Sequence, residues 1–159
     1  MTSLTIRPLR AADIDPLAQL MAATPLWQRH HVTYAGATRR LQAGLENNAT
    51  IDVAEVDGAA VGFIWYATRG IFLRSGYISL LGVSASQRGQ GVGQALMGHA
   101  EQVIFAEVKE IFLLVSDFNG AAQRFYQRMG YQQVGGIPDY LTPGVTELLF
   151  MKKKESGVR

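Results

Sequence analysis

A glycine-rich segment, Arg88-Gly89-Gln90-Gly91-Val92-Gly93, has the residue types and spacing for binding chemistry. It lies between an apolar run at residues 76–83, typical of a strand, and residues 94–104, which have helical spacing. Glycines at alternate positions leave one edge of a turn without side chains, so its backbone N–H groups can face a ligand. The N-terminus of a helix attracts anions, and an arginine beside it adds positive charge. The segment therefore predicts a site for a phosphate-bearing cofactor.

The spacing of these glycines argues against two common phosphate-binding motifs. A dinucleotide-binding fingerprint needs G-x-G-x-x-G, but Gln94 and Leu96 occupy the positions of the third glycine. A Walker loop needs Gly-Lys-Ser or Gly-Lys-Thr, and neither triplet occurs in the chain. Hydride transfer, nucleotide hydrolysis and a nucleotide-binding regulatory role are therefore disfavoured. A glycine loop standing alone is also compatible with a tight turn that binds nothing.

A second block of residues, Asn119-x-x-Ala122-x-x-Phe125-Tyr126-x-x-x-Gly130-Tyr131, follows the apolar run at residues 111–115. Asn119 is suited to cap the helix that it precedes, because its side-chain oxygen can accept a hydrogen bond from a free N–H. Tyr126 carries a phenol with an ordinary pKa near ~10, which can donate a proton to a developing anion. Its structural alternative is a buried aromatic whose hydroxyl is hydrogen-bonded.

Apolar periodicity and turn residues predict one α/β domain over residues 1–159. Asp13 is expected to cap a first helix that runs through Met21, and Asp57-Gly58 predicts a two-residue hairpin turn. A second hairpin is expected around Gly70 to Gly76. The order β-α-α-β-β-β-α-β-α-β-β indicates a mixed, mostly antiparallel sheet of about seven strands with about four helices. The expected strands are 4–9, 51–56, 60–66, the run ending at 83, 111–115, 131–134 and 146–151, and the expected helices are 13–21, the segment from Tyr34 to Asn47, 93–108 and 119–129.

Composition excludes several classes of protein. The chain has 159 residues, 48% of them hydrophobic, and no cysteine, which rules out disulfides and thiolate chemistry. No apolar run is long enough to span a membrane, and the first residues lack a secretory signal, so a cytoplasmic protein without a membrane partner is expected. A net charge of +2 is too small to indicate nucleic acid. The basic run Lys152-Lys153-Lys154 is expected to open a flexible tail at residues 152–159.

The two blocks together resemble the GNAT superfamily of acetyl-CoA-dependent N-acetyltransferases. Leu81-Gly82-Val83-x4-Arg88-Gly89-Gln90-Gly91-Val92-Gly93 is similar to the family signature Q/R-x-x-G-x-G/A. The Asn119–Tyr131 block is similar to its pattern N-x-x-A-x-x-F/L-Y-x-x-x-G-F/Y. The resemblance runs from Ile6-Arg7-Pro8-Leu9 to the last strand, and it implies a GNAT-like fold with acetyl-CoA as cosubstrate and no metal.

The resemblance also implies roles for individual residues. Main-chain groups of Leu81 and Val83 would bind the pantetheine arm, and Asn119 would contact the cofactor as well as cap its helix. Tyr126 would be the general acid that protonates the departing thiolate of CoA. The backbone amides that would hold the pyrophosphate belong to Arg88, Gly89, Gln90, Gly91, Val92, Gly93 and Gln94.

No residue is assigned as the general base. Many relatives carry a glutamate on the strand before the glycine loop, but Tyr77-Ile78-Ser79-Leu80-Leu81 has no carboxylate. Water relayed through Ser79, or a carboxylate from Asp139 or Glu147, remains an alternative. His30-His31 is expected in a loop without a metal, and His99 is expected to pack or to face solvent.

The acceptor amine is expected between residues 24–32, which include Trp27 and Arg29, and residues 137–145, which include Asp139 and Tyr140. The leading function is transfer of acetyl to a primary amine of a small molecule or peptide by direct attack, since a cysteinyl-acetyl intermediate cannot form. An acyl-CoA-binding or sensing module is the alternative. Protein N-termini, polyamines and aminoglycosides stay open as acceptors, and a homodimer is compatible with the resemblance.

Overall fold

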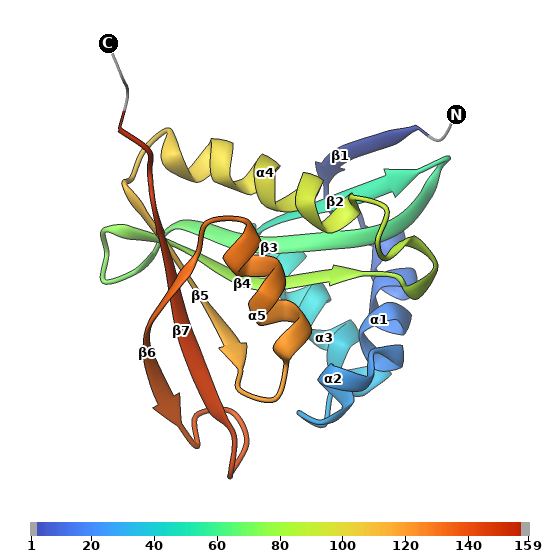
Figure 1. The fold of residues 1–159 in the computed structure, drawn as a ribbon. Helices are drawn as coiled ribbons and strands as arrows, with labels where there is room; N and C mark the ends of the chain where they lie inside the picture. Colours follow the sequence, from blue (N-terminus) through green and yellow to red (C-terminus); the bar gives the residue numbers. More distant parts are fainter. Residues whose placement is uncertain (1–2, 157–159) are drawn as a thin grey trace. The chain divides into compact units, whose positions relative to one another are not determined.

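The computed structural model describes residues 3–156, which divide into two compact units. The N-terminal unit extends to Tyr66 and includes Leu80–Ala100, and the C-terminal unit comprises Ala67–Ser79 and the chain from Glu101 onward. The strands form a seven-stranded sheet in the order β1-β2-β3-β4-β5-β7-β6 (Figure 1). Strands β3 (Ala59–Ile71) and β4 (Ser75–Val83) each contribute residues to both units. The predicted class, a mixed α/β fold on a mostly antiparallel sheet, is confirmed.

The N-terminal unit buries its core between helices and the strands β1, β2 and β3. Strand β2 pairs antiparallel with β1 and with β3. Leu17 and Met21 of the first helix pack with Leu41 and with Phe63 of β3, and all four side chains are almost completely buried. The predicted Asp57-Gly58 turn is confirmed, since both residues have positive φ, 50° and 84°. Besides parts of β3 and β4, this unit contains β1 (Leu4–Pro8), the short 3-10 helix η1 (Ala11–Asp13), α1 (Ile14–Ala23), α2 (Pro25–Gln28), α3 (Tyr34–Glu46), β2 (Thr50–Val56), η2 (Ala85–Gln87) and most of α4 (Val92–Phe105).

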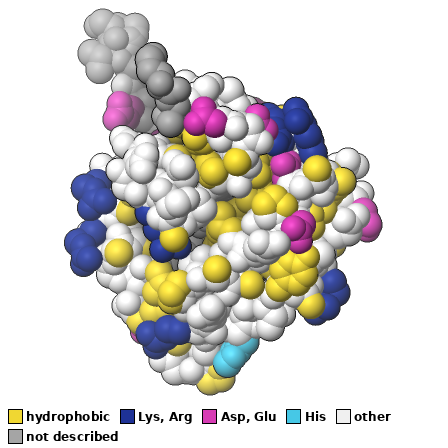
Figure 2. All heavy atoms as spheres, turned by 90° about the vertical axis from the view of Figure 1, so that its right-hand side faces the viewer, with side chains coloured by type: hydrophobic (Ala, Val, Ile, Leu, Met, Phe, Trp, Pro, Cys, Tyr) yellow, Lys and Arg dark blue, Asp and Glu magenta, His cyan; other side chains and the backbone are white. Residues whose placement is uncertain are grey.

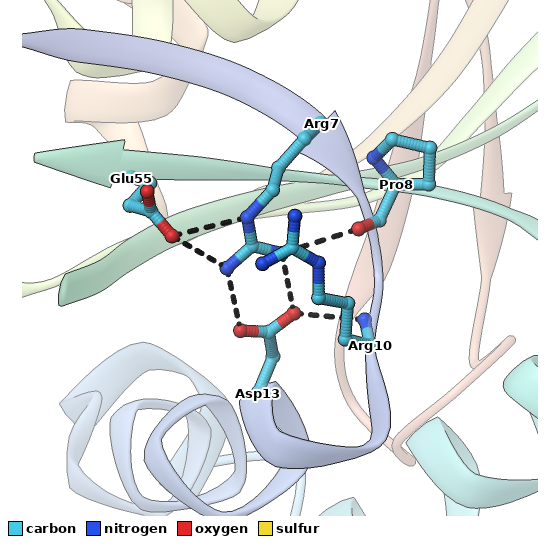
Figure 3. A network of polar contacts seen from close by, with 5 residues as sticks. All are labelled: Arg7, Pro8, Arg10, Asp13 and Glu55. Carbon is cyan, nitrogen blue, oxygen red and sulfur yellow. Dashed lines mark hydrogen bonds and ion pairs between the residues drawn. The ribbon is translucent and has the colours of Figure 1, made fainter. Parts of the chain in front are cut away.

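An ion-pair network ties β1 to the start of α1 (Figure 3). Asp13 occupies the N-cap position of α1 but caps no helical N–H, so the predicted capping bond was wrong. Its carboxylate instead accepts two hydrogen bonds from Arg7, at 2.7 and 2.9 Å, and one from the Arg10 amide at 2.8 Å. Arg7 also binds Glu55 of β2. Burial alone would raise the pKa of Asp13, but these hydrogen bonds outweigh it and hold the pKa below its ordinary value.

The helices of this unit differ from expectation at two places. α2 was not predicted, because a single turn of four residues beginning with Pro25 buries no side chain and shows no periodicity. α3 has the predicted extent, with Asn47 as its C-cap, but the residues spaced along one side of it, Tyr34, Ala37, Leu41 and Leu45, are not all buried. Ala37 and Leu41 are in the core, whereas Tyr34 is 46% exposed and donates a hydrogen bond to Asp15.

The C-terminal unit is organised around a buried parallel strand. β5 (Glu110–Ser116) runs parallel to β4 and antiparallel to β7 (Thr146–Lys153), which in turn pairs with the edge strand β6 (Gln132–Pro138). Helix α5 (Gly120–Arg128) connects β5 to β6. The predicted flexible tail was wrong at Lys152 and Lys153, because pairing with β5 extends β7 through both residues. Residues 157–159 of that predicted tail lie outside the described part of the chain. No helix within residues 3–156 has both the length and the hydrophobicity required to traverse a bilayer.

Candidate functional site

The glycine loop leads directly into helix α4. Gly89 and Gly91 have φ of 76° and 85°, a left-handed conformation that other residues adopt only at a cost in free energy. Gly93 lies within the first turn of α4. The helix makes its first main-chain bond from the Ala95 N–H to the Gly91 carbonyl, at 2.9 Å. The amides of residues 92–94 therefore precede the hydrogen-bonded part of the helix and need another acceptor.

Open space surrounds the loop. A Cβ placed on Gly89 or Gly91 would meet no atom within 4 Å. Arg88, Gly89, Gln90 and Gly91 are all exposed. Both glycines are therefore required by backbone conformation and not by internal packing. Main-chain amides at the start of a helix, beside this exposed loop and the Arg88 guanidinium, fit the phosphates of a nucleotide-containing cofactor.

Close packing fixes the first turns of α4 against β3. A Cβ on Gly62 would lie 2.8 Å from the carbonyl oxygen of Gly82, and 3.3 and 3.4 Å from Leu96 and Val92. Val92 and Leu96 are buried, at 3% and 0% exposure. Since no larger residue fits at position 62, this glycine sets how closely α4 approaches the sheet. The sequence alone does not indicate this packing role of Gly62, because a lone glycine in a strand has several explanations.

Leu81 and Val83 lie half-buried near the end of β4, on either side of the buried Gly82. The amide of Ser84 donates a 2.8 Å hydrogen bond to the Val61 carbonyl and so anchors the end of β4 to β3. The N-terminal unit thus contains Leu81, Val83 and residues 88–94, all of which the family resemblance assigns to the binding of one cofactor.

The second block forms the start of α5 in the C-terminal unit. Asn119 is the N-cap of α5, as predicted, and its Oδ1 accepts a 3.1 Å hydrogen bond from the Ala122 amide. The Asn119 amide itself donates to the Ser116 carbonyl at the end of β5. The cap therefore holds α5 to the carboxyl end of the parallel strand, and the helix carries Tyr126 less than two turns further on.

Tyr126 lies among aromatic rings. Its ring centroid is 5.2 Å from that of Phe125 and 6.0 Å from that of Tyr131, both in edge-type arrangements. Burial raises the pKa of the Tyr126 hydroxyl above its ordinary value. The hydroxyl therefore stays protonated at neutral pH, as a proton donor must.

A charged cluster, formed by Tyr131, Glu101 and Lys152, fixes the ring that supports Tyr126. Tyr131 is 1% exposed and donates a 2.8 Å hydrogen bond to Glu101, which also accepts one from Lys152 at 2.9 Å. The ammonium of Lys152 lies 5.7 Å from the centre of the Tyr131 ring. Burial, reinforced by the Glu101 carboxylate, raises the pKa of Tyr131. Glu101 and Lys152 were missed from sequence because no local pattern relates residues so far apart in the chain.

The two carboxylates considered as bases have structural partners. Asp139 has a φ of 56°, and its carboxylate accepts a 2.7 Å hydrogen bond from the Gly144 amide, which shapes the β6–β7 loop. Glu147 is 3% exposed and accepts a 2.8 Å hydrogen bond from the Ser116 hydroxyl. These contacts assign neither residue a catalytic role.

His99 was expected to pack or to face solvent, but its ring also lies within hydrogen-bond distance of a carboxylate. Its Nε2 lies 2.9 Å from a carboxylate oxygen of Asp52, and the hydroxyl of Tyr66 donates to the same oxygen at 2.7 Å. Burial, together with the hydrogen bond to Asp52, raises the pKa of Tyr66. Over residues 3–156, His, Asp and Glu side chains form no cluster of three that could hold a metal ion.

Comparison with known proteins places the chain in a family of transferases. The family model described as "Acetyltransferase (GNAT) family" matches residues 15–131, so the chain belongs to this family. An uncharacterized N-acetyltransferase of Methanocaldococcus jannaschii is 38% identical over 107 residues, which cover 66% of this chain and 67% of that protein. Blasticidin-S acetyltransferase of Streptomyces morookaense is 39% identical over 77 residues, 48% of this chain and 56% of the relative. The fold is also that of an aminoglycoside 6'-N-acetyltransferase crystallised with coenzyme A, with a TM-score of 0.77, 15% identity and coverage of 98% and 99% of the two chains.

Proposed function

We propose that this chain is an acetyl-CoA-dependent N-acetyltransferase that transfers acetyl to a primary amine by direct attack in a ternary complex. The observation that carries the proposal is the left-handed pair Gly89 and Gly91 at the exposed N-terminus of α4. Family membership and the coenzyme A complex of a protein with the same fold support this choice of cofactor.

We propose that three sets of residues contact the cofactor through main-chain and side-chain atoms. The amides of residues 88–94 bind the pyrophosphate, and the Arg88 side chain adds a charge-assisted contact. Main-chain groups of Leu81 and Val83 bind the pantetheine arm, and Asn119 adds a contact from the start of α5. When bound, acetyl-CoA supplies a thioester whose carbonyl carbon forms a bond to the amine nitrogen while the carbon–sulfur bond breaks.

Tyr126 is proposed as the general acid. Its hydroxyl holds the proton at neutral pH and delivers it to the departing sulfur, which would otherwise leave as a thiolate. Tyr131, held by Glu101 and Lys152, keeps the Tyr126 ring in place. The attacking amine must lose a proton, and no side chain of this structure is assigned to accept it.

The proposed acceptor is a primary amine of a small molecule or of a peptide. One relative is named for acetylation of blasticidin-S, which favours including amine antibiotics among the candidates. A panel of amines therefore contains an aminoglycoside, blasticidin-S, a polyamine and peptides with free N-termini.

The test combines calorimetric titration of acetyl-CoA with an assay of thiol release over this panel. The proposal expects binding together with release on at least one amine. Binding without release on any amine would favour the sensing module, and an absence of binding would refute both readings.

A matched pair of tyrosine variants tests the general acid. Tyr126→Phe is expected to reduce turnover by about 10²-fold, while the affinity for acetyl-CoA stays within about twofold, because only the proton donor is lost. The control, Tyr34→Phe, changes an exposed tyrosine of α3 and should leave turnover unaltered. Unchanged turnover in Tyr126→Phe would remove this residue from the mechanism.

A further inference from the structure

The hairpin between β3 and β4 ends in a turn of unusual composition. The Arg74 amide donates a 3.2 Å hydrogen bond to the Ile71 carbonyl, so Phe72 and Leu73 are the two central residues. Both adopt left-handed backbone, with φ of 55° and 56°. Turns of this kind favour Asn-Gly or Gly-Gly, because a large side chain makes this conformation costly.

Internal packing does not explain why two large apolar residues occupy this turn. Phe72 is 71% exposed and Leu73 is 90% exposed, the highest values among the exposed large hydrophobic side chains of the described chain. Phe72 makes one aromatic contact, with its ring centroid 6.0 Å from that of Phe112. Since folding gains little from either side chain, their presence indicates a contact with something outside the chain.

Basic residues flank this turn in the sequence and lie at the paired strand ends next to it. The starts of β4 and β5 lie side by side, because the Ser75 hydroxyl donates a 3.1 Å hydrogen bond to Glu110. The end of β7 joins them, since the Lys154 amide donates to the Lys109 carbonyl at 2.7 Å. The exposed cations at this end of the C-terminal unit are Arg69, Arg74, Lys109, Lys153 and Lys154.

These cations outnumber the nearby carboxylates. Only Glu107, Glu110 and Glu155 lie in the same three segments, and Glu107 forms a long 4.0 Å pair with Arg69. The five exposed cations exceed the three carboxylates by two positive charges, without counting the half-buried Lys152, which is paired with Glu101. The face shown in Figure 2 carries both Lys or Arg side chains and Asp or Glu side chains.

We propose that the Phe72–Leu73 turn docks reversibly on the surface of an anionic lipid bilayer. The two side chains enter the boundary between headgroups and acyl chains, while the surrounding arginines and lysines face the lipid phosphates. A convex tip of two apolar residues suits a soft surface better than a flat protein partner, and Leu73 has no stacking role that nucleic acid could use. This inference departs from the expectation of no membrane partner, which rested on the absence of a membrane-spanning segment and of a secretory signal.

The experiment is co-sedimentation of the full chain with vesicles. Vesicles of phosphatidylcholine alone are compared with vesicles that contain phosphatidylglycerol as about a third of the lipid. We expect binding to rise by about tenfold with the anionic lipid and to fall again at high salt, because the net charge at the turn attracts the surface. The double variant Phe72→Asn, Leu73→Gly supplies residues that prefer this turn, so it should fold at least as well as the wild type.

The proposal expects the double variant to lose vesicle binding by about tenfold while it keeps thermal stability and thiol release. A matched control, Val134→Ser, removes another exposed apolar side chain from β6 and should bind vesicles like the wild type. Equal binding of wild type and double variant, or no gain from phosphatidylglycerol, would overturn the proposal. Self-association that depends on the turn, without vesicle binding, would also overturn it and would show contact between copies instead.

Discussion

Substitution of Gly91 by alanine provides a direct test of the glycine loop. The φ of 85° is left-handed, and a Cβ at this position would touch no atom within 4 Å, so the added strain comes from the backbone alone. This conformation costs an alanine about 1–2 kcal/mol relative to glycine. If the loop keeps its shape, that cost lowers the free energy of unfolding. If the loop relaxes, the cost is met on binding, and the Kd for acetyl-CoA rises by about 5- to 30-fold.

The two measurements together distinguish these cases. Chemical denaturation gives the change in the free energy of unfolding, and calorimetric titration of acetyl-CoA gives the change in affinity. The matched control is Gly98→Ala, which lies within α4 and also has open space around its Cβ. Alanine favours a helix by about 1 kcal/mol over glycine, so this variant should be more stable and bind normally. Wild-type stability and wild-type affinity in Gly91→Ala would refute the argument that the turn requires glycine.

Two further predictions concern the N-terminal unit. Asp13→Asn removes the buried carboxylate that pairs with the half-buried Arg7 and should lower the free energy of unfolding by about 3 kcal/mol near neutral pH. The pKa of Asp13 lies below its ordinary value of 3.8, so its contribution is complete above that pH and is lost as the pH falls further. Denaturation of both proteins from pH 6 to pH 2 should show a constant difference above pH 3.8 that shrinks below it, and a difference that stays constant throughout would contradict this origin. Gly62→Ala should lower the free energy of unfolding by about 2 kcal/mol, because its Cβ would lie 2.8 Å from the Gly82 carbonyl oxygen. The variant should also bind acetyl-CoA more weakly, because the start of α4 is displaced. An unchanged affinity for acetyl-CoA would show that this packing does not affect the cofactor site.

The second hairpin shows where sequence reasoning succeeds and where it fails. Asp57-Gly58 located the first turn correctly, because both residues tolerate positive φ and stand between two alternating strands. The same reasoning placed the second turn only roughly, near Gly70 and Gly76. Gly76 instead serves packing in a strand, since a Cβ there would lie 2.4 Å from Ile104. The actual turn uses Phe72 and Leu73, whose identities carry no local signal for it.

In the candidate site, too, features set by neighbouring residues were predictable and contacts between distant residues were not. Contiguous features, such as the Gly89–Gly91 loop and the Asn119 cap, were predicted from spacing, because their geometry depends on neighbouring residues. Pairs that form only in the tertiary structure were not. Tyr131 meets Glu101 across 30 positions, and His99 meets Asp52 across 47. Such contacts depend on how strands and helices pack, which a single sequence does not specify locally.

The use of arginine at the glycine loop has a chemical consequence for an enzyme of this kind. Every lysine of the chain belongs to the C-terminal unit, whereas the N-terminal unit, which carries the loop, has arginine as its only long cationic side chain. A lysine amine is a nucleophile once deprotonated, and a bound thioester would acetylate it slowly without any catalyst. The guanidinium of Arg88 stays protonated and lacks a free electron pair for that reaction. On the proposed function, the loop would therefore attract a phosphate with a positive charge that repeated exposure to an acetyl donor does not remove.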